Sequence, residues 1–275
     1  ICNTSDSLAA KKNSSLHWHN FIEVTGFVGA TANKRFTDLG PVKDEFLHEA
    51  VNKQNYFNTT LAPHAPYSVS EQLFELINAD TAGQLTTIHN QEAAAENELY
   101  QKKAGGFLEL YQNIGIDISY FNATGKTSLQ SWLPHLNRQQ KIISVHNNFT
   151  SQHDIDFVKQ TNPGISFCIC INANRYIEQI NPPIELLMKN NCNMVLGTDS
   201  LASNHQLNIW EEIKTIRQQF ASINLETLLQ WATSNGAAVL QMNDVLGSIE
   251  KGKQPGLVLI EKPDDLINST AKRID

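Results

Sequence analysis

Short runs of β-branched and apolar residues alternate with longer amphipathic stretches along the chain, and this alternation limits the possible folds more than any other feature. It is typical of βα units, in which parallel strands are joined by helices. The predicted strands lie at residues 20–28, 58–62, 84–89, 141–146, 164–170 and 193–196. The sequence therefore predicts an α/β protein built on a parallel sheet.

Helical patterns follow these strands, and Ser70 and Ser151 stand where helix N-caps belong. Residues 116–121 read as a short strand or a loop, followed by a helix from Ser128. After Gly247 the alternation stops, and GSIEKGKQPGLVLIEKP predicts turns and one apolar strand at 257–260, which must pair within the same protein. The predicted helices lie at residues 43–54, 70–82, 91–113, 151–161, 182–190, 208–221 and 225–240.

Composition narrows the class of protein. The chain has 275 residues and 41% hydrophobic residues, enough for a sizeable core and too many for a disordered chain. A net charge of -7 argues against nucleic acid or an anionic membrane as partner, and no apolar run reaches the ~20 residues of a membrane span. The four cysteines lack Cys-x-x-Cys spacing, which favours a reducing cytoplasm. We expect a cytoplasmic protein with a small-molecule substrate. Whether it forms a homo-oligomer is left open by the sequence.

Four polar residues stand at equivalent ends of predicted strands. His64 follows the second strand, His89 ends the third, His146 ends the fourth and Asp199 follows the sixth. A single histidine is more often an ordinary core or surface residue, but four such positions are hard to dismiss. In a parallel αβ barrel these strand ends form the active site. Histidine and aspartate there can bind a divalent metal and lower the pKa of its water.

Glu92 comes three residues after His89, at the predicted start of a helix. Its carboxylate can reach the same cavity and move protons. The alternative is a first-turn carboxylate that favours the helix dipole, alongside Glu96 and Glu98. We expect Glu96 and Glu98, further along the helix, to turn towards solvent.

Several motifs together carry a family resemblance: PHAPYSVS, His89-x-x-Glu92, VHNNFT, CINAN and GTDSLASN. The chain resembles the amidohydrolase superfamily, in the branch that contains chlorohydrolases, guanine deaminase and S-adenosylhomocysteine/methylthioadenosine deaminases. The resemblance implies a TIM (β/α)8-type barrel, of which residues 1–245 supply strands 3–8. It also implies that residues 246–275 contribute a strand to a small composite β-sandwich.

The resemblance implies that His89 and Asp199 are metal ligands. It assigns to Glu92 the transfer of protons between the metal-bound water and the leaving amine, and it counts Asp199 with the catalytic residues. The implied cofactor is one divalent ion, zinc foremost, with iron or manganese as alternatives.

The same resemblance implies that His146 is a catalytic residue that polarises the substrate. His64 corresponds to a substrate-contacting histidine. Asn174, in CINAN, is expected to shape the substrate pocket.

The family also binds its metal through a His-x-His pair at the end of its first barrel strand. The candidate here is His17-Trp18-His19, which we reject because it enters LHWHNFIEVTGF, a segment that resembles the third strand of the family. We therefore expect the N-terminal part of the enzyme to be absent from this sequence, so the metal site of this chain could be empty. Whether a His-x-His pair precedes the chain stays open.

Three functions remain open at this point. The first is a metal-dependent hydrolase that displaces ammonia from a purine-like or related C–N substrate. The second keeps the same water activation but expels chloride or opens a cyclic amide. The third is a degenerate, non-catalytic barrel that serves as a binding or assembly module.

Overall fold

The structure is a computed structural model that describes residues 1–50 and 56–274. The chain divides into two compact units. The first comprises Ile1–Val145 and Phe149–Ile165, and the second His146–Asn148 and Ser166–Asp275. Within the described ranges, every helix is too short or too polar to cross a membrane.

The first unit is built on consecutive strands in the predicted order. β1 (Trp18–Val24) pairs in parallel with β2 (Phe57–Pro63), and β3 (Leu85–Asn90) lies beside β2, where the Thr60 hydroxyl donates to the carbonyl of Leu85 at 2.8 Å. The next strand, β4 (Lys141–His146), neighbours β3. Most side chains of β2, β3 and β4 are buried, as expected for strands covered by helices on one side and filling a core on the other.

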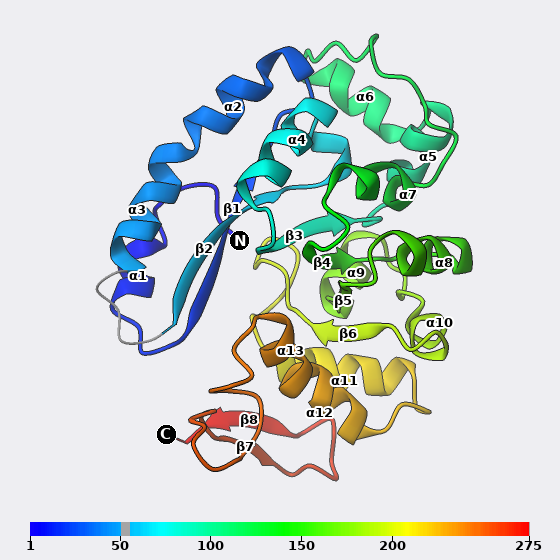
Figure 1. Cartoon of the computed structure of the whole chain (residues 1–275). Coiled ribbons are helices and arrows are strands. Elements are labelled where there is room, and N and C mark those ends of the chain that lie inside the picture. The colour runs from blue at the N-terminus through cyan, green and yellow to red at the C-terminus, as the bar shows by residue number, and fades with distance from the viewer. Residues whose placement is uncertain (51–55, 275) are drawn as a thin grey trace. The chain divides into compact units, whose positions relative to one another are not determined.

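Helices surround these strands, and α2 and α3 run alongside the β1–β2 pair (Figure 1). The two predicted N-caps are confirmed: Ser70 Oγ accepts from the amide of Leu73 at 3.3 Å, and Ser151 Oγ accepts from the amide of Asp154 at 3.2 Å. The helices of this unit are α1 (Leu8–Lys12), α2 (Ala32–Asp38), α3 (Gly40–Ala50), α4 (Glu71–Asp80), α5 (Ala94–Lys102), α6 (Gly106–Asn113), α7 (Ser128–Trp132) and α8 (Gln152–Thr161).

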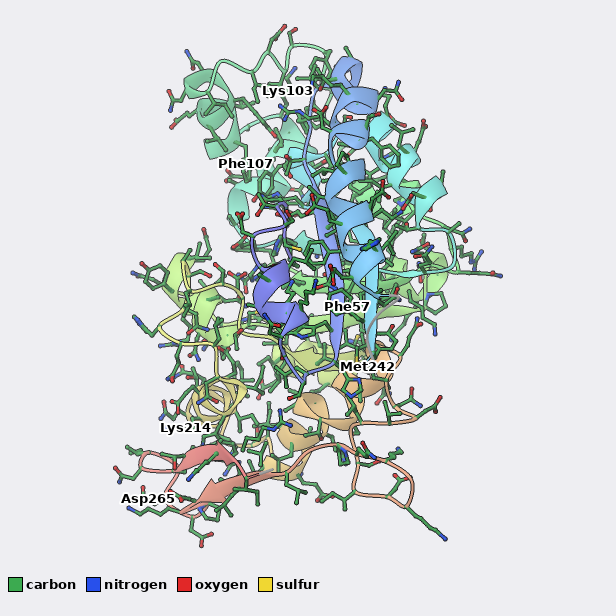
Figure 2. The ribbon with its side chains drawn as sticks, turned by 90° about the vertical axis from the view of Figure 1, so that its left-hand side faces the viewer. Phe57, Lys103, Phe107, Lys214, Met242 and Asp265 are labelled. Atoms are coloured by element: carbon green, nitrogen blue, oxygen red, sulfur yellow. The ribbon has the colours of Figure 1, made fainter. Side chains whose placement is uncertain are left out.

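One predicted helix of this unit is wrong, and another lies only partly within the described residues. The predicted helix 91–113 is two helices, because Lys103 and Gly105 take left-handed conformations (φ 50° and 87°). The φ of Gly105 disfavours any residue with a side chain, and a Cβ there would lie 3.0 Å from Cβ of Glu98. Figure 2 labels Lys103, which lies at this break, and Phe107, which follows it in the next helix. For the predicted helix 43–54, α3 is found, and residues 51–54 lie outside the described part of the chain.

The loop at 116–121 forms no strand, which settles the alternative left by the sequence. It packs into an aromatic cluster instead: Phe121 lies edge-on to Tyr100, with ring centroids 5.5 Å apart, and Ile118 is buried with them. A short helix, α7, then begins at Ser128 as predicted.

The second unit contains β5 (Ile165–Ile169, whose first residue belongs to the first unit) paired in parallel with β6 (Asn193–Leu196). The predicted terminal strand is present as β7 (Val258–Glu261), and it pairs in a two-stranded antiparallel sheet with β8 (Thr270–Arg273), a strand that was not predicted. The predicted helix 225–240 is interrupted at Thr233. The helices are α9 (Ile171–Ile177), α10 (Ile184–Lys189), α11 (Ile209–Gln219), α12 (Leu225–Ala232) and α13 (Ser234–Val239).

Directly after β6, Gly197 passes close to two buried thiols. Its amide donates to the carbonyl of Ile169 at 3.0 Å, continuing the β5–β6 pairing. A Cβ at this position would lie 2.7 Å from Sγ of Cys168 and 3.0 Å from Sγ of Cys170. The absence of a side chain therefore lets the chain leave β6 towards Asp199.

Candidate active site

In the first unit, Glu23, His64 and His89 form a group that we call the carboxylate–histidine cluster. Each offers a ligand atom within 4.8 Å of the others. Oε1 of Glu23 lies 3.5 Å from Nε2 of His89, and the rings of His64 and His89 have centroids 5.3 Å apart. Both histidines were predicted from the sequence and Glu23 was not, although an acidic residue near the end of the apolar run NFIEV was a usable signal.

The cluster forms because three neighbouring strands end at the same edge. Glu23 is opposite Ala62 in the parallel β1–β2 register, so β1 and β2 end together. His64 follows β2 directly and donates its amide to the carbonyl of Val24 at 3.1 Å, while the amide of His89 donates to the carbonyl of His64 at 2.9 Å. Backbone pairing therefore fixes the relative positions of the three side chains.

Electrostatics favour the ionisation states that bind a divalent metal. Burial lowers the pKa of His64, and Nδ1 of its ring lies 2.6 Å from the Ser68 hydroxyl. Burial alone would raise the pKa of Glu23, but the hydrogen bond to His89 and the nearby charge of His64 and His89 lower it overall. One carboxylate and two imidazoles form a donor set that suits zinc, iron or manganese.

Glu92 stands just before α5, close enough to act on the cluster electrostatically. Its charge favours the protonated form of His64. It also contributes, after burial, to the raised pKa of Tyr67, whose ring lies edge-on to His64 with centroids 5.8 Å apart. The structure thus brings His64, His89 and Glu92 to one region of the first unit.

Glu96 does not face solvent, so that expectation is wrong, whereas Glu98 is exposed as expected. The reason is the start of the helix: α5 begins at Ala94, not at Gln91, and this places Glu96 in the first turn. From there its carboxyl points back under the turn that follows β3 and accepts the amide of Gln91 at 2.7 Å.

In the second unit, His146 and Asp199 offer ligand atoms within 4.8 Å of each other. Nδ1 of His146 lies 2.8 Å from Oδ1 of Asn174 on α9, and both residues are fully buried. This contact makes Nδ1 the protonated nitrogen, which orients the ring. His146 and Asp199 both have left-handed backbones (φ 73° and 57°), and strain of this kind concentrates at functional sites.

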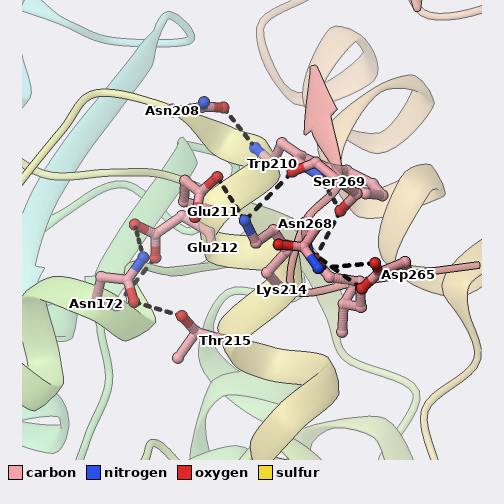
Figure 3. A network of polar contacts seen from close by, with 11 residues as sticks. Asn172, Asn208, Trp210, Glu211, Glu212, Lys214, Thr215, Asp265, Asn268 and Ser269 are labelled. Carbon is pink, nitrogen blue, oxygen red and sulfur yellow. Dashed lines mark hydrogen bonds and ion pairs between the residues drawn. The ribbon is translucent and has the colours of Figure 1, made fainter. Parts of the chain in front are cut away.

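The loop that carries Asp199 is anchored to α11 through the buried carboxylate of Glu212, whose contact with Asn172 is drawn in Figure 3. Glu212 accepts from the side chains of Asn172 and Asn204, at 2.9 and 2.8 Å, and Asn204 also donates to the carbonyl of Thr198 at 2.8 Å. Burial raises the pKa of Glu212. The amide hydrogen bonds of the two asparagines therefore satisfy a group that is costly to bury.

The opposite side of α11 holds the C-terminal segment. Nε1 of Trp210 donates to the Ser269 hydroxyl at 3.0 Å, and Nζ of Lys214 lies 3.4 Å from the carbonyl of Ser269 (Figure 3). One helix therefore supports both the Asp199 loop and the residue that precedes β8.

The predicted ligand pair has one member in each unit, His89 in the first and Asp199 in the second, and it stays a prediction. The rejected pair lies elsewhere: His19 is near the start of β1, whereas Glu23 is near its end. Its ring nitrogens are 3.1 Å from the Thr60 hydroxyl and 3.4 Å from the Tyr56 hydroxyl. Nδ1 of His17 accepts the amide of Tyr56 at 3.1 Å.

The chain combines a parallel α/β architecture with histidines and acids at its strand ends, and it belongs to the amidohydrolase family, whose model matches residues 18–273. The chain is 30% identical to the 5'-deoxyadenosine deaminase of Methanococcus vannielii over 240 residues, which are 82% of this chain and 50% of that protein. It is 26% identical to the aminodeoxyfutalosine deaminase of Nitratiruptor sp., covering 98% of this chain and 64% of that protein.

Solved structures agree on the fold. Aminofutalosine deaminase from Helicobacter pylori superposes with a TM-score of 0.83 at 20% identity, covering 99% of this chain and 72% of that one. An adenosine deaminase from Xanthomonas campestris with bound zinc gives a TM-score of 0.59 at 26% identity, covering 83% and 48%. The chain spans about half the length of several curated relatives that it matches.

Proposed function

We propose that the protein is a metal-dependent aminohydrolase that releases ammonia from a purine-like C–N substrate of the adenosine-type nucleoside class. The observation that carries the proposal is the carboxylate–histidine cluster at the ends of β1, β2 and β3, with Glu92 beside it. Relatives named as deaminases of 5'-deoxyadenosine and of methylthioadenosine support the substrate class. The proposal also places the enzyme in the cytoplasm.

His89 and Asp199 are the proposed ligands of one divalent ion, with zinc foremost. When bound, such an ion lowers the pKa of its water, so that hydroxide is available near neutral pH. Glu23 extends the set of candidate ligands, because its carboxylate lies 3.5 Å from His89. In this proposal residues 1–245 belong to the barrel, and residues 246–275 to the composite sandwich.

The protein side chains bind the substrate and move its protons. Glu92 takes the proton released when water attacks the ring carbon and delivers it to the departing nitrogen, because an amide anion is too poor a leaving group. His146, oriented by Asn174, hydrogen-bonds to the substrate where negative charge develops. His64, held by Ser68, contacts the bound substrate from the side of β2.

The test uses protein expressed from its complete reading frame and loaded with zinc. We expect ammonia release from one or more of 5'-deoxyadenosine, methylthioadenosine, S-adenosylhomocysteine and aminodeoxyfutalosine. Atrazine, scored by chloride release, and a cyclic amide test the other hydrolases. Turnover of those compounds alone would replace the deaminase assignment, and metal-loaded protein that turns over none of the panel would refute it.

A further inference from the structure

Glu96 is a fully buried carboxyl for which the proposed reaction has no use. Its Oε1 accepts two hydrogen bonds, from the amide of Gln91 at 2.7 Å and from the Ser128 hydroxyl at 2.5 Å. Its Oε2 has no hydrogen-bond partner among the described residues. Burial of an incompletely satisfied carboxyl is costly, so stability alone does not account for this residue.

The first turn of α5 shows what Glu96 does instead. In a common N-terminal arrangement, a glutamate at the third helical position reaches back to the amide of the N-cap residue. The N-cap here is Ala93, which provides no side-chain cap. Glu96 is at the third helical position but reaches two residues further back, to Gln91. It therefore holds the turn between β3 and the helix rather than the helix end.

That turn is strained, and it separates His89 from Glu92. Gln91 has φ 48°, a left-handed conformation that costs a non-glycine residue roughly 1–2 kcal/mol. Gln91 is fully buried, and its side-chain oxygen accepts from the Thr150 hydroxyl at 2.7 Å. The backbone amide is held by Glu96. Hydrogen bonds at both ends of Gln91 thus maintain a conformation that the residue would otherwise leave.

We propose that Glu96 is a positioning residue: by holding the amide of Gln91 in the left-handed turn, its carboxyl fixes where Glu92 lies relative to His89. The role of Glu92 in proton transfer rests on the proposed function, but the fixed turn does not. The raised pKa of Glu96, which burial brings to about 7, is compatible with this role, because Oε1 can accept hydrogen bonds in either protonation state.

The test compares four variants of the zinc-loaded protein from the complete reading frame. Glu96→Ala removes the acceptor, and Glu96→Gln keeps an oxygen at the same reach. Glu98→Gln is the matched control on the exposed side of α5. Ser128→Ala removes the other hydrogen bond to Glu96 but leaves the one to Gln91. If Glu96→Ala does not fold, Glu96→Asp replaces it, because the shorter side chain keeps the carboxyl group and loses the reach.

The first readout is hydrogen exchange at the Gln91 amide, which does not depend on activity. We expect Glu96→Ala to exchange this amide roughly 10- to 100-fold faster, as for a lost hydrogen bond to a charged or buried acceptor. Glu96→Gln, Glu98→Gln and Ser128→Ala should keep it protected. Unchanged exchange in Glu96→Ala would overturn the proposal.

The second readout is kcat against KM for ammonia release. Misplacement of Glu92 should lower kcat of Glu96→Ala by about 10²-fold, with KM changed much less. Glu96→Gln should restore kcat, and Ser128→Ala should lose thermal stability but not kcat. Equal losses of kcat in Glu96→Ala and Ser128→Ala would overturn the proposal. If the wild type releases no ammonia, the proposed function fails, and the exchange at Gln91 alone decides whether Glu96 holds the turn.

Discussion

Glu96→Gln is expected to remove a specific pH dependence from the free energy of unfolding. In the folded protein, burial raises the pKa of Glu96 to about 7, against 4.5 for an unperturbed glutamate. The folded state therefore keeps a proton that the unfolded state has already lost. Because the folded pKa is the higher one, the associated stability is fully present below about pH 4.5 and is lost as the pH rises through about 7.

The magnitude follows from the two pKa values. Between about pH 5 and pH 8, proton linkage to this one group lowers the free energy of unfolding by about 2.5 kcal/mol. Glutamine does not titrate, so this component disappears in Glu96→Gln. The buried amide group of the glutamine adds a cost of its own, but that cost is the same at both pH values and cancels in the difference.

The assay is urea denaturation of the wild type and Glu96→Gln at both pH values, with Glu98→Gln as the control for loss of one negative charge. We expect the stability difference between the two pH values to shift by about 2.5 kcal/mol in Glu96→Gln relative to wild type. The control should behave like the wild type. Equal pH differences in wild type and Glu96→Gln would show that Glu96 does not carry a raised pKa in the folded protein.

Three further predictions address the site. Glu92→Gln should leave folding and metal content intact and reduce turnover by about 10²–10⁴-fold, measured as ammonia release; near-normal turnover would move the proton transfer to another residue. Asn174→Ala should lower kcat by freeing the His146 ring, and a pH–rate profile identical to wild type would argue against this orienting role. Asn204→Ala should lower the free energy of unfolding by about 1–3 kcal/mol in urea denaturation, because the carbonyl of Thr198 and the carboxylate of Glu212 lose their donor. The exposed Asn243→Ala is the control, and an equal effect of both variants would contradict this prediction.

The parallel strands β1 to β6 and their order were predictable because β-branched runs of four to nine residues between amphipathic stretches leave few alternatives. The break between α5 and α6 was not predicted. The chain turns there through left-handed backbone at Lys103 and Gly105, and the adjacent glycines Gly105-Gly106 were a turn signal in the sequence that the prediction of one helix ignored.

The candidate site was partly predictable for a similar reason. Histidines at strand ends are visible in the sequence, so His64, His89 and His146 could be named. Glu23 was missed because it lies within an apolar strand, where its neighbours suggest only core. Glu96 was predicted to face solvent because the helix was predicted to begin three residues too early. That shift changes the face on which Glu96 lies, and helix boundaries are the least certain part of a sequence-based prediction.

The contact between Gly197 and the two thiols has a consequence for how this sequence can change over time. An alanine at 197 would collide with Sγ of Cys168 at 2.7 Å, so it is a damaging first step while that cysteine is present. A prior change of Cys168 to alanine would remove the nearer sulfur, and Sγ of Cys170, 3.0 Å from the new methyl group, would then have to move by only a few tenths of an ångström. We therefore expect substitution of Cys168 to precede substitution of Gly197. Once residue 197 carries a side chain, a return to cysteine at 168 would bring the clash back and is disfavoured.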